Sequence, residues 1–149
     1  MTDDLFFSLA ALVALAPAAA LAWRRDGGRD ALYWAVLVFA VAGPLIWAVA
    51  QMQGTWRTGF SATLWVDVAV SMALFGFAAA ITSQAWRLTS LTALYMIALG
   101  GIATVWQKAP YKPLSAMAPV GWTEAHILLS MATYGLLTVA AVAALAAFL

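Results

Sequence analysis

Five apolar stretches dominate the pattern of hydrophobic and polar positions along the chain. They cover residues 5–23, 31–52, 60–81, 88–106 and 125–149. Each approaches or exceeds the roughly 20 helical residues that cross a hydrocarbon core. None alternates as a half-buried strand would, and an open sheet edge cannot lie in lipid. The pattern predicts an all-α fold, an integral membrane bundle of five transmembrane helices, in one domain over residues 1–149.

Composition narrows the class of protein further. The 149 residues are 66% hydrophobic and 9% charged, which excludes an ordinary water-soluble domain. The chain contains no cysteine, so thiol chemistry and iron–sulfur ligation are excluded. A net charge of +1 argues against nucleic-acid binding. Asp3 and Asp4 precede the first stretch where a signal peptide carries positive charge, so we expect that stretch to be a retained helix.

The lysines and arginines between the stretches predict the orientation of the chain. The first and third connections carry Arg24, Arg25, Arg29 and Arg87, whereas the second and fourth carry Arg57, Lys108 and Lys112. Because basic connections stay in the cytoplasm, we expect the N-terminus outside and the C-terminus inside. Tryptophans should then mark the two interfaces. They are Trp23, Trp34 and Trp86 on the inner side, and Trp47, Trp56, Trp106 and Trp122 on the outer side.

His126, the only histidine, is the strongest candidate for metal chemistry. At helical spacing it shares a stripe with Ser130 and Thr133, with Tyr134 beside them. A polar stripe in lipid must face protein, water or a ligand. One interpretation is that the imidazole binds haem iron, with Ser130 or a backbone carbonyl orienting the ring. The other is an interfacial histidine bonded to a neighbouring helix or to water.

Asp67 is the second unusual position, because a carboxylate inside an apolar stretch costs free energy unless it is satisfied. It could serve as a proton relay or orient a ligand. Alternatively, it could be a buried group bonded to Gln51, Ser71 or Tyr95. Periodicity leaves both interpretations open.

The region around His126 resembles a known family. Residues 121–149 carry Trp122 and His126 before Leu-Leu-Ser, where the serine is Ser130, then Tyr134 and an Ala/Leu-rich helix. This pattern is similar to the first conserved helix of the cytochrome c assembly family. The four preceding helices resemble the layout of its HemX-like and YpjD-like members, which lie in the bacterial inner membrane.

The resemblance implies haem handling at the outer membrane face. His126 matches the first of the family's haem-binding histidines, and Trp122, Ser130 and Tyr134 are the expected neighbours of the haem. The chain resembles only the amino-terminal half of that fold and has no second histidine. A membrane partner, or the missing carboxyl-terminal half, would therefore have to supply the second ligand.

Three classes of function follow from these observations. The first is a haem-binding protein of cytochrome c assembly. The second is a non-catalytic membrane scaffold or accessory subunit of a larger complex, and the third is a small-molecule carrier that depends on Asp67. An enzyme is not expected, because no nucleophile has a base beside it in the sequence pattern.

Overall fold

A computed structural model describes residues 2–23, 28–52, 57–110, 112–113 and 120–148. Its long helices are α1 (Thr2–Ala20), α2 (Ala31–Met52), α3 (Phe60–Ile81), α4 (Thr89–Val105) and α5 (Val120–Phe148). Three short 3-10 helices are η1 (Leu21–Trp23), η2 (Ala85–Leu88) and η3 (Trp106–Lys108). Five helical segments are long and apolar enough to cross a membrane. The predicted all-α bundle is confirmed.

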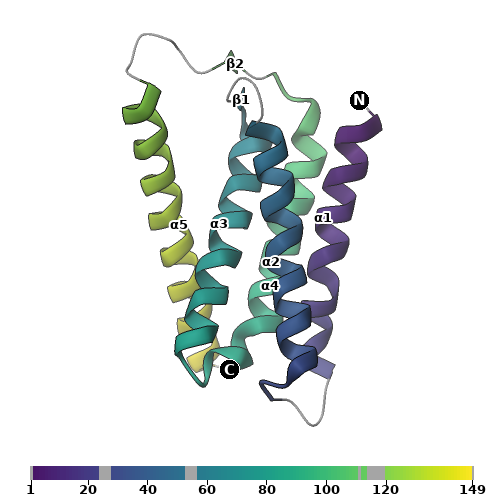
Figure 1. Ribbon diagram of the computed structural model, residues 1–149, viewed down its shortest axis with the longest axis vertical. Coiled ribbons are helices and arrows are strands. Elements are labelled where there is room, and N and C mark those ends of the chain that lie inside the picture. The colour runs from purple at the N-terminus through teal and green to yellow at the C-terminus, as the bar shows by residue number, and fades with distance from the viewer. Residues whose placement is uncertain (1, 24–27, 53–56, 111, 114–119, 149) are drawn as a thin grey trace.

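Four of the helices form a closed bundle, and the fifth stands at its side (Figure 1). α1 and α3 each pack against both α2 and α4. α5 packs along α3 and touches α4 only weakly. Successive helices run in opposite directions. One end of the bundle carries the N-terminus and the α2–α3 and α4–α5 connections, and we call it the N-terminal end. The opposite end carries the C-terminus, and we call it the C-terminal end.

A short strand pair lies at the N-terminal end, outside the helices. β1 (Arg57–Thr58) and β2 (Lys112–Pro113) pair antiparallel, with Arg57 opposite Pro113 and Thr58 opposite Lys112. Because both strands belong to connections, all their backbone lies beyond the apolar helices. The pair joins the α2–α3 connection to the α4–α5 connection.

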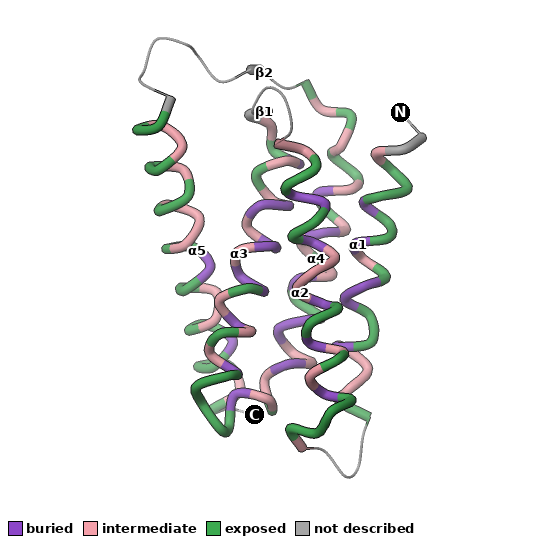
Figure 2. The backbone as a smooth tube through the Cα atoms, in the orientation of Figure 1, coloured by how far each residue is buried: buried purple, intermediate pink, exposed green. Residues whose placement is uncertain are grey.

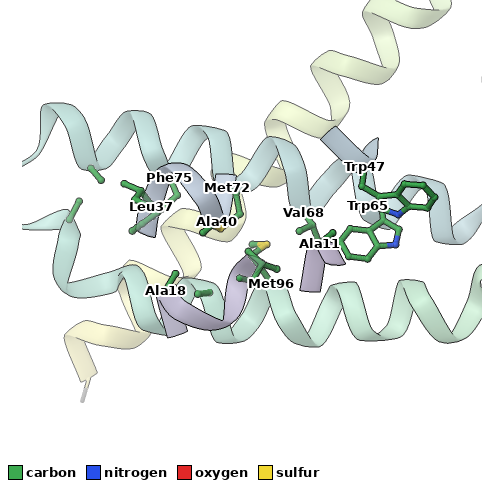
Figure 3. Packing of buried hydrophobic residues seen from close by; sticks show 14 of the residues in the cluster. Ala11, Ala18, Leu37, Ala40, Trp47, Trp65, Val68, Met72, Phe75 and Met96 are labelled. Atoms are coloured by element: carbon green, nitrogen blue, oxygen red, sulfur yellow. The ribbon is translucent and has the colours of Figure 1, made fainter. Parts of the chain in front are cut away.

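The core lies inside the four-helix bundle. Buried positions follow the facing sides of α1 to α4, whereas α5 is mostly exposed or half-buried (Figure 2). Trp65, Met72 and Phe75 from α3 are almost completely buried. Figure 3 shows these side chains in line along the bundle, with Trp47 of α2 next to Trp65. Trp65 therefore closes the core toward the N-terminal end, enclosed by the neighbouring helices.

The tryptophans near the helix ends differ in exposure. Trp23 is 85% exposed beside the C-terminal end, and Trp122 is 76% exposed in the first turn of α5. Trp47 lies near the last turn of α2, where it is buried and stacks on Phe7 of α1 with ring centroids 5.6 Å apart. Trp56, Arg24 and Arg25 lie outside the described residues.

Small residues allow the helices to approach closely. A Cβ added to Gly43 of α2 would overlap the Cβ of Ala14 in α1. A Cβ on Gly100 of α4 would lie 2.9 Å from Leu12 Cδ2 and 3.1 Å from Trp65 Cη2. Such close packing drives helix association in lipid, where helices gain little from the hydrophobic effect.

The start of the fifth helix differs from the prediction. α5 begins at Val120, five residues before the expected start at Ala125. Trp122 therefore belongs to the first turn of α5 rather than to the connection before it.

Candidate functional site

His126 lies in the second turn of α5, near the N-terminal end, and its side chain is exposed. The direction of its side chain follows from Gly135. A Cβ on Gly135 would lie 3.1 Å from Ser71 Oγ and 3.3 Å from Ser71 Cα, so this side of α5 packs on α3. The nine positions from His126 to Gly135 are about two and a half helical turns. His126 therefore lies on the side of α5 that faces away from α3.

The hydroxyl groups of Ser130 and Thr133 form hydrogen bonds within α5. Ser130 Oγ donates to the carbonyl of His126 at 2.8 Å, and Thr133 Oγ1 donates to the carbonyl of Leu129 at 2.9 Å. Such bonds to the carbonyl four residues earlier satisfy a hydroxyl without a neighbouring helix. Ser130 thus contacts the main chain of His126, and this bond does not orient the imidazole.

Trp122 and Tyr134 lie on different sides of the helix. Trp122 precedes His126 by four positions, so it lies one turn away on the same outward side. Tyr134 lies eight positions beyond His126 and lines a groove next to α3 and α4. The structure therefore groups Trp122, His126 and Ser130 on the outward side, with Tyr134 separated from them.

The groove between α3, α4 and α5 has a volume of about 820 Å³. It exists because α5 packs on α3 but barely reaches α4. Its walls are mainly apolar, and His126 is not among them. They are formed by Thr63, Leu64 and Asp67 of α3, Leu91, Leu94 and Tyr95 of α4, and Met131, Tyr134, Leu137, Thr138, Ala141, Val142 and Leu145 of α5. The wall residues from α5 recur every three or four positions. This spacing, which places residues on one side of a helix, is the sequence pattern that could have predicted this wall.

Asp67 is the charged residue in the wall of the groove. Its Oδ1 is buried and has no hydrogen-bond partner among the described residues. Within the same part of the chain, Gln51 Nε2 and Ser71 Oγ also lack partners, and no hydrogen bond joins Asp67 to Tyr95. Among the described residues, therefore, neither Gln51 nor Ser71 nor Tyr95 bonds to Asp67 Oδ1. Asp67 forms part of the groove wall, while its Oδ1 is covered by surrounding atoms.

A small polar cavity at the N-terminal end was not expected from the sequence. It measures about 40 Å³ and lies between α1, α2, α3 and the residues after α4. Trp47 Nε1, Gln51 Nε2 and Ser61 Oγ are buried around it without described partners. A polar cavity of this size admits water. Its residues are distant in sequence, so no local pattern predicted it.

The described residues can contribute one imidazole, but not a complete metal site. They contain no group of three histidine, cysteine or acidic side chains that could hold a metal ion. The exposed His126 imidazole could bind haem iron through one nitrogen. A second histidine ligand would have to come from another chain or segment, because His126 is the one histidine in these 149 residues.

Comparison with known proteins identifies a bacterial relative. The chain is 44% identical over 154 aligned residues to an uncharacterized 28.8 kDa protein in the nifR3-like 5′ region of Azospirillum brasilense. The alignment includes the whole of this chain and 57% of the relative, so the chain spans little more than half of that protein. No protein-family model matches the chain. No solved structure matches it.

Proposed function

We propose that the chain is a haem-handling protein of cytochrome c assembly, and that His126 binds or presents haem near the outer membrane face. The observation that carries this proposal is the outward position of His126. Its imidazole lies near the end of an apolar helix, on the side opposite the contact with α3. An imidazole in that position can bind a ligand without any rearrangement of the four-helix bundle.

The proposed orientation places the N-terminal end outside a bacterial inner membrane. Arg29 comes directly before α2 and Arg87 belongs to η2, both at the C-terminal end. In the sequence, Arg24 and Arg25 belong to the same connection as Arg29. The opposite end has three basic residues, spread over two connections. The concentration of arginines in the first connection supports a cytoplasmic C-terminal end. His126 is then on the side where cytochromes c receive haem.

The proposed site is shared between this chain and a second component. His126 provides one nitrogen ligand, and Trp122 offers an exposed aromatic face one turn away. When bound, haem supplies an iron centre and a strong Soret absorption band. The additional length of the Azospirillum protein supports a search for the second ligand in a further membrane segment or in a partner.

The test is absorption spectroscopy of the full chain, purified in detergent and titrated with haemin. We expect a Soret band that is lost in His126→Ala. The matched control is the double variant His126→Ala/Leu128→His, which keeps one histidine but moves it to another side of α5. A band that is equal in all three proteins would reject His126 as the ligand.

The groove favours a second candidate, a carrier of a small apolar molecule with a hydrogen-bond donor. Its supporting observation is the presence of Asp67, which carries a carboxylate, in the wall of a mainly apolar hollow of about 820 Å³. This candidate predicts ligand binding that Asp67→Asn weakens and His126→Ala leaves unchanged. A scaffold, by contrast, would show neither a Soret band nor ligand binding, but would co-purify with a larger complex through the exposed side of α5.

A further inference from the structure

A cavity of about 230 Å³ lies at the C-terminal end of the bundle. Its walls come from Leu21 and Ala22 of η1, Gly28 before α2, Tyr33 of α2, Trp86 and Arg87 of η2, and Ser90 of α4. All of these residues lie at or next to helix ends. A membrane that covers the apolar spans would therefore place the cavity at the level of the lipid head groups.

Arg87 supplies positive charge to this cavity. Its guanidinium lies 5.8 Å from the ring of Trp86, and with the described residues it forms no ion pair or side-chain hydrogen bond. Arg29, also at this end, donates to the carbonyl of Ala80 at 3.1 Å. The acidic Asp30 accepts a hydrogen bond from the backbone N–H of Tyr33 at 2.8 Å, which places its carboxylate at the start of α2. Among the described residues that line the cavity, Arg87 is the one with a positive charge.

Hydrogen bonds between helices hold the walls in place. The hydroxyl of Tyr33 pairs with Thr89 Oγ1 at 3.3 Å, and both residues are almost fully buried. Ser90 Oγ donates to the carbonyl of Ala18 at 3.3 Å, which joins α4 to α1. The cavity is therefore formed by fixed contacts and does not need to be opened by its ligand.

We propose that this cavity binds the phosphate group of an anionic phospholipid, with Arg87 as its main contact. A guanidinium matches phosphate oxygens in charge and in geometry. Basic pockets between transmembrane helices bind anionic lipid head groups. Leu21, Ala22 and Trp86 provide apolar surface for the glycerol and the first part of the acyl chains. The site does not depend on the proposed haem binding.

Native mass spectrometry of the full chain in detergent tests this site, with added dioleoyl phosphatidylglycerol or dioleoyl phosphatidylcholine. We expect preferential retention of one phosphatidylglycerol. Arg87→Gln should weaken its binding about fivefold, the effect of one basic residue near a lipid surface. Lys108→Gln removes the same charge at the opposite end and should have no effect. Ala22→Phe keeps every charge but fills the cavity, and should weaken binding as well.

Each alternative has its own result. Equal retention of the two lipids, or equal effects of Arg87→Gln and Lys108→Gln, would overturn the site. Loss in Arg87→Gln without loss in Ala22→Phe would mean attraction by surface charge and no cavity site. Displacement of the lipid by equimolar glycerol 3-phosphate or inorganic phosphate would assign the cavity to a soluble phosphate. Arg87→Lys keeps the positive charge and should therefore retain part of the binding. Circular dichroism of every variant would identify any loss of binding that is due to misfolding.

Discussion

Gly135 in α5 lies directly against Ser71 in α3. A Cβ on the glycine would be 3.1 Å from Ser71 Oγ and 3.0 Å from Leu74 Cδ1, so a larger residue would have to displace one of these groups. This contact lies on the interface that attaches α5 to the bundle. It also sets the rotation of α5, and thereby the outward direction of His126.

The first prediction uses the absence of cysteine from the chain. The double variant Ser71→Cys/Gly135→Cys should form an intramolecular disulfide on mild oxidation, because the two backbones approach closely enough for a disulfide to bridge them. Peptide mass spectrometry would detect the cross-link. Ser71→Cys/His126→Cys is the matched control and should not cross-link, because position 126 lies on the far side of α5 and about 13 Å along its axis. Equal yields in the two variants would show that α5 is rotated differently.

The second prediction compares two adjacent glycines in α4. Gly100 touches Leu12 and Trp65, whereas a Cβ on Gly101 would have nothing within 4 Å. Gly100→Ala should therefore lower the free energy of unfolding by about 1–3 kcal/mol through overpacking. Gly101→Ala should be neutral or raise it by up to about 1 kcal/mol, because alanine favours the helix. Unfolding in mixed micelles, followed by circular dichroism, would measure both; a larger loss at Gly101 would contradict the packing of α4.

The third prediction concerns the free-energy cost of Asp67. Because its Oδ1 is buried without a described partner, Asp67→Leu should raise the free energy of unfolding by about 1–3 kcal/mol, the usual penalty for a buried polar group that lacks a hydrogen bond. Thr63→Val, on the same wall of the groove, is the control for a change from polar to apolar. The same unfolding measurement applies. A loss of stability in Asp67→Leu would reveal a favourable interaction of the carboxylate.

The fourth prediction concerns the hydrogen bond between Tyr33 and Thr89. Tyr33→Phe should lower the free energy of unfolding by about 0.6–1 kcal/mol, a typical value for one such bond. Tyr95→Phe should have almost no effect, because Tyr95 is exposed and has no described hydrogen bond. A double-mutant cycle with Thr89→Val would isolate the coupling between the two side chains. Additive effects in that cycle would mean that the bond contributes nothing.

Hydropathy predicted the spans because the length of an apolar run is a local property of the sequence. The predicted ranges 31–52 and 60–81 are the same as those of α2 and α3. Hydropathy could not predict which sides of the helices meet, because each helix is apolar around most of its circumference. Contacts such as Gly43 with Ala14 depend on the shape of two distant segments.

The polar stripe on α5 shows what sequence spacing can and cannot reveal about the site. Spacing predicted that His126, Ser130 and Thr133 share a side, but gave no information on what that side faces. The position of Gly135 against α3 supplies this information, and it separates the outward His126 from the groove at Tyr134. The groove itself results from the weak contact between α5 and α4, which no pattern within one helix can encode.

The one-sided attachment of α5 has a consequence for substitutions in this helix. Nearly all of the buried core belongs to α1 to α4, so substitutions on the outward side of α5 leave that core intact. Such substitutions can therefore alter the outward surface of α5 without altering the packing of the other four helices.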